Sequence, residues 1–294
     1  MRTVATFAGA REASRGAVGL VPTLGFLHEG HLALVARARQ ASDTVVMSLF
    51  VNPLQFDDAD DLAAYPREIE RDAALAEAHG VDVLFAPPVE EMYPAEPLTR
   101  VVVSEVADAM EGAERSGHFE GVATVVAKLL VGLRPDRMFM GRKDAQQLAV
   151  VRTMTADLSF PTDVVGVPTV READGLALSS RNVRLADRSA ALGLSAGLFS
   201  AADAVEVGER SASALEGIVI GSITRSGAVP DYATLADAAT ARPIEGLDRP
   251  AFLAAAARVG DVRLIDNVFL WPDGTADRGS RLEGRSVLYE EVSP

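Results

Sequence analysis

The sequence of 294 residues contains no cysteine. This absence excludes disulfide bonds, thiolate metal sites and a cysteine nucleophile. Positive charge is also in short supply, because 28 Lys and Arg stand against 42 Asp and Glu, which gives a formal net charge of −14 at pH 7. Since the neutralisation of nucleic-acid phosphates takes a basic face, this balance argues against a protein that binds nucleic acid.

Long apolar runs are missing as well. No stretch approaches the roughly 18 uninterrupted apolar residues that a membrane-spanning helix needs, so we expect no membrane partner. The first residues lack the apolar core of a signal peptide, and we therefore expect a cytoplasmic protein. Hydrophobic residues nevertheless form 48% of the chain, which is ordinary for a globular protein, and the length allows two domains.

The first part of the chain alternates apolar, β-branched runs with helical patterns, which is typical of an α/β fold with a doubly wound parallel sheet, Rossmann-like in form. In such sheets ligands bind beyond the carboxyl ends of the strands. The predicted strands are 16–21, 44–51, 81–85, 99–103, 137–140 and 162–167, and the predicted helices are 32–41, 67–79, 122–133 and 145–158.

The composition changes after Arg184 and becomes rich in alanine. Helical patterns cover 188–206 and 215–225, shorter apolar segments lie near 228–232 and 262–267, and 273–285 is typical of a hairpin or loop. We therefore predict a Rossmann-like domain over residues 1–182 and a smaller C-terminal α+β lid domain over 183–294.

The most informative motif is Pro-Thr-Leu-Gly-Phe-Leu-His-Glu-Gly-His at positions 22–31, which follows an apolar run. It predicts a strand, a glycine turn and a helix start, where unpaired N–H groups bind phosphate. His28 and His31 lie three residues apart and face the same way, and each can donate to a phosphoryl oxygen. The helical zinc motif spaces its histidines at i and i+4, so zinc is disfavoured. Two surface histidines remain the alternative interpretation.

Four further segments offer chemistry. Asn52 and Gln55 follow the second strong strand and suit a substrate with hydroxyl and carboxylate groups. The segment Glu111–Gly121 carries Arg115 and His118, although taken by itself it is better explained as an ordinary surface loop.

The other two segments suit phosphate. Lys143 and Asp144 follow a strand end, and Gln146 and Gln147 lie on the next helical turn. Leu178-Ser-Ser-Arg-Asn182 combines two hydroxyls with a guanidinium, as a phosphate clamp does. The alternative for the first segment is that its charged pair only caps a helix, and the alternative for the second is a solvated turn.

The His-x-x-His element resembles the signature of the nucleotidyltransferase superfamily, which includes class I aminoacyl-tRNA synthetases and cytidylyltransferases. Taken together, the order and spacing of these motifs resemble the pantothenate synthetase family. The resemblance spans residues 17–267, is weaker across 205–260, and includes Tyr65-Pro-Arg67, Gly117-His-Phe119, Arg134-Pro-Asp136 and Arg263-Leu-Ile-Asp-Asn267.

The resemblance implies that ATP adenylates pantoate and that β-alanine then displaces AMP, giving pantothenate. It implies catalysis by His31, His28, Lys143 and Arg181, with His31 the nearest group to a proton donor. Gln55, Gln147 and Asn52 would bind pantoate and β-alanine. Mg²⁺ would arrive with ATP, with Asp72 as a weak candidate ligand, and the protein would be a homodimer. The ATP site would be lined by Leu24, Gly25, Phe26, Leu27, His28, Glu29, Gly30, His31, Gly141, Arg142, Lys143, Asp144, Val170, Leu178, Ser179, Ser180 and Arg181.

Three residues depart from the family pattern. Leu24 stands where many members carry Met, Ser116 replaces a usual Pro, and Arg142 replaces a usual Glu. We expect Arg142 to point away from the phosphates, toward solvent or an acidic side chain. Two other functions remain open: another nucleotidyltransferase, such as a cytidylyltransferase, or a nucleotide-sensing protein that Arg142 has made inactive.

Overall fold

The computed structural model describes residues 1–56, 62–63 and 65–289. The chain divides into two compact units. Unit 1 comprises Met1–Gly141 and Val150–Val167, and unit 2 comprises Arg142–Ala149 and the described residues from Pro168 onward. Among the described helices, none combines the length and hydrophobicity that a membrane crossing requires.

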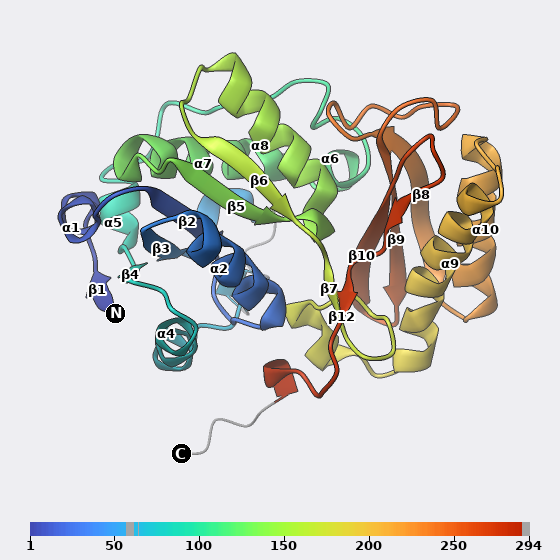
Figure 1. The fold of residues 1–294 in the computed structure, drawn as a ribbon, viewed down its shortest axis with the longest axis horizontal. Helices are drawn as coiled ribbons and strands as arrows, with labels where there is room; N and C mark the ends of the chain where they lie inside the picture. The colour runs from blue at the N-terminus through green and yellow to red at the C-terminus, as the bar shows by residue number, and fades with distance from the viewer. Residues whose placement is uncertain (57–61, 64, 290–294) are drawn as a thin grey trace. The chain divides into compact units, whose positions relative to one another are not determined.

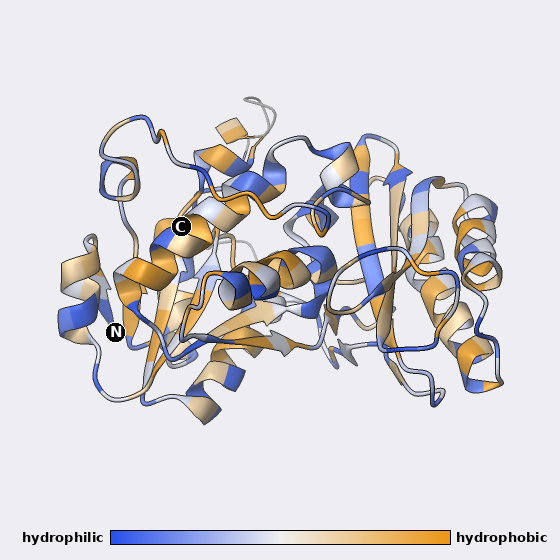
Figure 2. Ribbon diagram, turned by 90° about the horizontal axis from the view of Figure 1, so that it is seen from above, coloured by the Kyte–Doolittle hydropathy of each residue, from blue (hydrophilic) through white to orange (hydrophobic). Residues whose placement is uncertain are grey.

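Unit 1 is built on a six-stranded parallel sheet with the strand order β1-β4-β3-β2-β5-β6. This confirms the predicted doubly wound parallel sheet. Figure 2 shows its strands mostly in tan and orange, the colours of hydrophobic residues. The strands are β1 (Arg2–Val4), β2 (Val18–Thr23), β3 (Thr44–Leu49), β4 (Val83–Phe85), β5 (Arg137–Gly141) and β6 (Asp163–Val167).

Helices cover both faces of this sheet, with α7 and α8 on one side and α2 and α4 on the other (Figure 1). Right-handed crossovers between parallel strands produce this division. On the second side, Leu34 and Val35 of α2 and Ala76 of α4 pack against buried strand residues. The helices are α1 (Phe7–Ala13), α2 (Glu29–Ala41), η1 (Pro53–Gln55), α4 (Ile69–Ala78), α5 (Val89–Met92), α6 (Glu111–Glu114), α7 (His118–Leu133) and α8 (Ala145–Asp157), of which α8 begins in unit 2.

One predicted strand of unit 1 is wrong, and one real strand escaped prediction. Residues 99–103 form no strand, and the Val101 N–H donates to Thr124 Oγ1 of α7 at 3.0 Å. The strand that pairs with β4 on its outer side is instead β1, at the start of the chain. Three residues are too few to produce a recognisable hydrophobic period, so β1 gave no signal.

Unit 2 is an antiparallel sheet with the order β11-β10-β9-β8 and two helices packed on one of its faces (Figure 1). Its core is formed by apolar side chains of α9, α10, β9 and β10. The middle strand β9 was not predicted, because its run Ala-Phe-Leu-Ala-Ala-Ala-Ala has weak strand preference. The elements are α9 (Arg188–Glu206), α10 (Ala212–Arg225), β8 (Val229–Asp237), β9 (Ala251–Val259), β10 (Val262–Leu270) and β11 (Ala276–Asp277).

The chain first enters unit 2 at Arg142–Ala149 and returns to it at Pro168, so this division differs from the single boundary predicted after residue 182. The short strand β7 (Val170–Arg171) pairs in parallel with β12 (Ser280–Arg281). The buried Arg171 guanidinium forms two hydrogen bonds to the Asp266 carboxylate of β10, at 2.6 and 3.0 Å. These long-range contacts place the segment that carries the Ser-Ser-Arg motif in the smaller unit.

Candidate active site

The motif of unit 1 forms a tight turn between β2 and α2. Gly25 has φ +100° and Phe26 has φ +54°, and the first of these values favours glycine because it lacks a Cβ. The helix then begins at Glu29, with His28 as its N-cap residue. The sequence therefore places both imidazoles where unpaired helix N–H groups begin, as predicted.

The two histidines cap this helix reciprocally. His28 Nδ1 accepts from the Gly30 N–H at 3.1 Å, and His31 Nδ1 accepts from the His28 N–H at 3.3 Å. The ring centroids lie 4.2 Å apart. Because Nδ1 of each neutral ring acts as the acceptor, the proton lies on Nε2. Both rings are thus fixed in the tautomer whose far nitrogen is a hydrogen-bond donor.

Asp72 of α4 holds the turn in place. Its Oδ2 accepts from the Phe26 N–H at 2.7 Å and its Oδ1 from the Leu27 N–H at 2.8 Å. Burial raises the pKa of this carboxyl group, although the two backbone donors work in the opposite direction. Arg71 supports the same turn by donating to the Leu27 carbonyl at 3.1 Å.

These contacts do not favour the metal-ligand role predicted for Asp72. Both of its oxygens already accept backbone N–H groups. Over the described part of the chain, no group of three His, Cys, Asp or Glu side chains is placed to hold a metal ion. Asp72 acts in this structure as the anchor of the turn.

A second cluster follows β3, where Asn52 is the N-cap residue of η1 and Gln55 is its last residue. Asn52 is completely buried, and its Nδ2 donates to Gln55 Oε1 at 3.2 Å and to the Gly121 carbonyl at 3.1 Å. Its Oδ1 accepts from the Tyr93 hydroxyl at 2.9 Å and from the Leu54 N–H at 3.3 Å. Burial raises the pKa of Tyr93 to about 12, so the hydroxyl keeps its proton at neutral pH.

All four hydrogen-bonding positions of the Asn52 amide are occupied by protein groups in this structure. Its predicted contact with substrate stays a prediction. Gln55 differs, since no partner is assigned to its Nε2 within the described residues and its oxygen is held by Asn52. Asn52 orients Gln55, and Gln55 presents an amide donor.

His118, at the start of α7, was undervalued by sequence analysis. Its Nδ1 lies 2.9 Å from the Gln55 carbonyl and its Nε2 lies 3.2 Å from Arg115 NH1. The helix can approach η1 because Gly121 has no side chain; a Cβ there would lie 2.1 Å from the Leu54 carbonyl oxygen. The Gly-His-Phe-x-Gly spacing carried this signal, and the start of α7 supports Gln55 through the contact of His118 with its carbonyl.

Unit 2 carries the lysine motif on η2 (Arg142–Asp144), immediately after β5. Lys143 is half-buried, and its Nζ lies 3.4 Å from Asp144 Oδ1. Arg142 NH1 donates to Asp277 Oδ2 at 2.6 Å, and its guanidinium lies over the Phe269 ring. This confirms the expectation that Arg142 points toward an acidic side chain. Gln147 is half-buried on the first turn of α8.

The serine motif of unit 2 lies on η3 (Ser180–Arg184). Ser179 is its N-cap residue, with Oγ accepting from the Arg181 N–H at 3.3 Å. The Leu178 N–H donates to the Val170 carbonyl at 3.0 Å, so the two buried residues predicted to line a nucleotide lie side by side. Arg181 is exposed and Ser180 is half-buried.

The sequence matches the model of the pantoate-beta-alanine ligase family over residues 1–269. The chain belongs to this family. It is 53% identical over 254 residues to the pantothenate synthetase of Heliobacterium modesticaldum, a match that covers 85% of this chain and 90% of that relative. The resemblance drawn from the motifs is therefore confirmed, and the chain is identified as an enzyme of the ligase class.

Solved structures of the ligase family agree with the fold. The pantothenate synthetase of Thermus thermophilus matches with a TM-score of 0.86 and 48% identity, over 91% of this chain and 98% of that one. The ligase of Francisella tularensis, complexed with beta-gamma ATP and beta-alanine, matches with a TM-score of 0.72 and 31% identity, over 91% and 97%.

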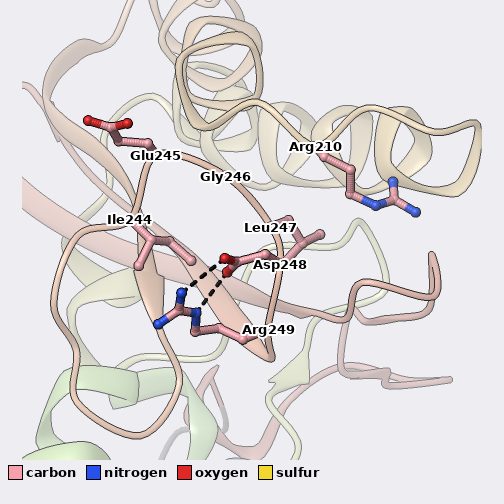
Figure 3. A pocket seen from close by; sticks show the side chains of 7 residues that line it. All are labelled: Arg210, Ile244, Glu245, Gly246, Leu247, Asp248 and Arg249. Carbon is pink, nitrogen blue, oxygen red and sulfur yellow. Dashed lines mark hydrogen bonds and ion pairs between the residues drawn. The ribbon is translucent and has the colours of Figure 1, made fainter.

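Unit 2 of this ligase also has an open pocket on the loop before β9. Figure 3 shows Asp248 and Arg249 facing each other in it, with hydrogen bonds of 2.7 and 2.9 Å. Its other lining residues are Arg210, Ile244, Glu245, Gly246 and Leu247. None of these residues belongs to a predicted motif, so we assign the pocket no part in the reaction.

Proposed function

We propose that this chain joins pantoate to β-alanine in two steps driven by ATP. A pantoate carboxylate oxygen attacks the α-phosphorus of ATP, the bond to the β-phosphate breaks, and pyrophosphate leaves. The β-alanine amine then attacks the acyl carbon of pantoyl adenylate, loses a proton and releases AMP. Family membership supports the overall reaction, and the Francisella ligase, complexed with beta-gamma ATP and beta-alanine, supports the substrates.

The observation that carries the first step is the reciprocal cap of His28 and His31. Negative charge develops on phosphoryl oxygens during adenylation, so preorganised donors lower the barrier. The two rings have their Nδ1 atoms occupied as acceptors, which leaves Nε2 as the donor on each. We assign these donors to the phosphates, with His31 nearest the transferred group.

The lysine and serine motifs supply the cationic and hydroxyl groups that we assign to ATP. Unit 2 contributes Lys143 and Arg181 as cations, with hydroxyls from Ser179 and Ser180. The remaining nucleotide-lining residues are Leu24, Gly25, Phe26, Leu27, Glu29, Gly30, Gly141, Arg142, Asp144, Val170 and Leu178, where Arg142 takes part through its backbone because its side chain is held by Asp277.

We assign pantoate to Gln55 and Gln147. Gln55 Nε2 is a donor suited to a carboxylate or hydroxyl oxygen, and Asn52 holds the rest of that amide in place. Gln147 is half-buried on α8. Magnesium would enter as the ATP complex and be held by phosphate oxygens and water, since Mg²⁺ keeps much of its hydration. We derive no step through a protein-bound metal.

We also propose a homodimer, formed through unit 1. Residues 99–103, which have strand preference, form no strand. Val102 within this segment is 66% exposed, and Leu98 just before it is 98% exposed. An extended segment with exposed apolar residues is suited to pairing with a second copy, and two-fold dimers are the commonest assembly. We also propose a cytoplasmic location, which is compatible with a reaction that consumes ATP.

A coupled assay of AMP tests the proposal. AMP must form only when pantoate, β-alanine and ATP are all present, and pyrophosphate must form with pantoate and ATP alone. A stable nucleotidyl product would favour another nucleotidyltransferase, and ATP binding without turnover would favour a nucleotide sensor.

A further inference from the structure

Asn267 of β10 contacts the backbone of the lysine motif directly. Its Nδ2 donates to the Arg142 carbonyl at 3.0 Å and to the Lys143 carbonyl at 2.6 Å. The residue is deeply buried, with only 3% of its surface exposed. One amide nitrogen therefore ties together two successive carbonyls of η2, on either side of the Lys143 N–H and Cα.

The oxygen of this amide contributes no hydrogen bond to the described part of the fold. Asn267 Oδ1 is buried, and within the described residues it has no hydrogen-bond partner. A buried acceptor without a partner costs free energy. The opposite orientation of the amide would aim its oxygen at two carbonyl oxygens, which repel it. The donor half is thus what fits this position.

Asn267 is itself held by a buried network inside unit 2. Its N–H donates to Asp266 Oδ1 at 2.7 Å, and its carbonyl accepts from Arg171 NH2 at 3.0 Å. Arg171 and Asp266 form the buried bidentate pair described above. Arg171 follows Val170, so the network connects the β7 segment to η2 through two adjacent residues of β10.

We propose that Asn267 is a positioning residue for Lys143. By fixing the carbonyls of Arg142 and Lys143, it sets the direction in which the lysine side chain leaves the backbone, and a preorganised cation stabilises a transition state better than a mobile one. The inference rests on the proposed function, in that Lys143 acts on the ATP phosphates.

The test uses the full-length protein and measures pantoate-dependent exchange of pyrophosphate into ATP. Asn267→Asp keeps the shape but replaces the donor with a carboxylate, and Asn267→Ala removes it. We expect each variant to lower kcat of the exchange by about ten- to a hundredfold, with a smaller change in KM for pantoate. Leu264→Ala is the matched control, because Leu264 lies on the same strand and packs in the core beneath α9 and α10.

The decisive readout is the combination with Lys143→Ala. If Asn267 acts through the lysine, the double variant Asn267→Asp/Lys143→Ala is no slower than Lys143→Ala alone, because the group being positioned is already gone. Multiplying effects in the double variant would overturn the inference, as would unchanged exchange in Asn267→Asp or an equal loss in Leu264→Ala.

Hydrogen exchange tests whether Asn267 orders η2, and the pyrophosphate exchange of Lys143→Ala separates failure of the inference from failure of the proposed function. We expect faster amide exchange across 142–146 in Asn267→Ala and unchanged exchange there in Leu264→Ala. If Lys143→Ala leaves pyrophosphate exchange at the wild-type rate, the assignment of Lys143 to the phosphates is wrong and the inference falls with it. If Lys143→Ala is slow while the Asn267 variants are normal, the inference alone is overturned.

Discussion

The turn before α2 in unit 1 takes its geometry from residues close by in the chain and from one carboxylate of α4. The two motif segments of unit 2 are held by residues outside the motifs, from ten residues away for η3 to more than a hundred for η2. Asn267 binds η2 across 124 and 125 residues of sequence, and η3 is fixed through Glu172, whose Oε1 accepts from Asn182 at 2.9 Å and from the Tyr289 hydroxyl at 2.8 Å.

The difference is between a motif whose own side chains cap it and motifs that are held in place by residues elsewhere in the chain. The histidine turn supplies its own cap, since the His28 side chain accepts from the Gly30 N–H and the His31 side chain accepts from the His28 N–H. Neither η2 nor η3 contains the groups that hold its carbonyls and side chains in place. We therefore expect mutations of the first kind of motif to act on the proposed chemistry directly, and mutations around the second kind to act through the residues that hold it.

The largest expected effect is on the turn itself. His31→Ala removes a donor to the phosphoryl oxygens and should lower the rate of adenylation by roughly 10²–10³, with a smaller loss of ATP binding. Single-turnover release of pyrophosphate measures it. His79→Ala, at the exposed end of α4, is the control. Unchanged pyrophosphate release would show that His31 has no role in this step.

The anchor of the turn comes next. Asp72→Ala leaves the N–H groups of Phe26 and Leu27 without their acceptors, which should cost about 2–3 kcal/mol of unfolding free energy. Loss of the turn geometry should also slow adenylation by about 10²-fold. Denaturant unfolding and the exchange assay check both, with the exposed Glu70→Ala on the same helix as control. A normal rate with normal stability would contradict the anchor role.

Local signals account for what the sequence predicted well. Helix α9 has the predicted bounds because Asp187 caps it, with Oδ1 accepting from the Ala190 N–H at 3.1 Å, and an apolar period follows. The histidine turn was predictable for the same reason. By contrast, β9 was not predicted, because its alanine-rich run has weak strand preference and its strand state depends on pairing with β8 and β10.

The roles of individual site residues were predictable only in part. The sequence placed Asn52 and Gln55 together, but it gave no sign that Tyr93 and Gly121 bind the asparagine amide. Asn267 lay in a recognisable motif without an evident task, because its partners are over a hundred residues away. Residue type indicates what a group can bind, and the fold decides which partner takes it.

Within unit 1, Gln55 and Asn52 allow a residue proposed to contact pantoate to be compared with one that positions it. Gln55→Ala should raise KM for pantoate by about tenfold or more and leave the affinity for ATP near normal, because one substrate hydrogen bond is lost. Asn52→Ala should raise the same KM and also lower the melting temperature, since it leaves buried partners unpaired. Steady-state kinetics with thermal unfolding compares them. An unchanged KM in Gln55→Ala would place pantoate elsewhere.

The ion pair of Arg142 with Asp277 tests how strongly activity depends on the charge at position 142. Because its guanidinium is paired with Asp277, Arg142→Glu should change kcat/KM for ATP by less than about tenfold, or roughly 1.4 kcal/mol. The double variant Arg142→Glu/Asp277→Arg should return the value toward wild type. A large gain in activity from Arg142→Glu would show instead that the arginine impairs the phosphate site.

The smallest expected effect concerns the ion pairs of Arg188 with Asp174 and Glu172, next to η3 in the chain. Arg188 binds Asp174 at 2.6 Å and also binds Glu172, the residue that holds Asn182. Burial by itself would raise the pKa of Asp174, but the hydrogen bonds from Arg188 and the Leu176 N–H outweigh it and lower the pKa.

A carboxyl group whose pKa is lower in the folded protein than in the unfolded chain stabilises the fold above its unfolded pKa, and that contribution is lost as the pH falls through the folded pKa. Asp174→Asn should therefore reduce the unfolding free energy at pH 7 and leave it nearly unchanged in the acid range below both pKa values. Because a third of each side chain is exposed, we expect a difference of less than about 1 kcal/mol. Urea unfolding from pH 7 to pH 3 measures it, and a deficit of equal size at every pH would show that the pair acts by packing.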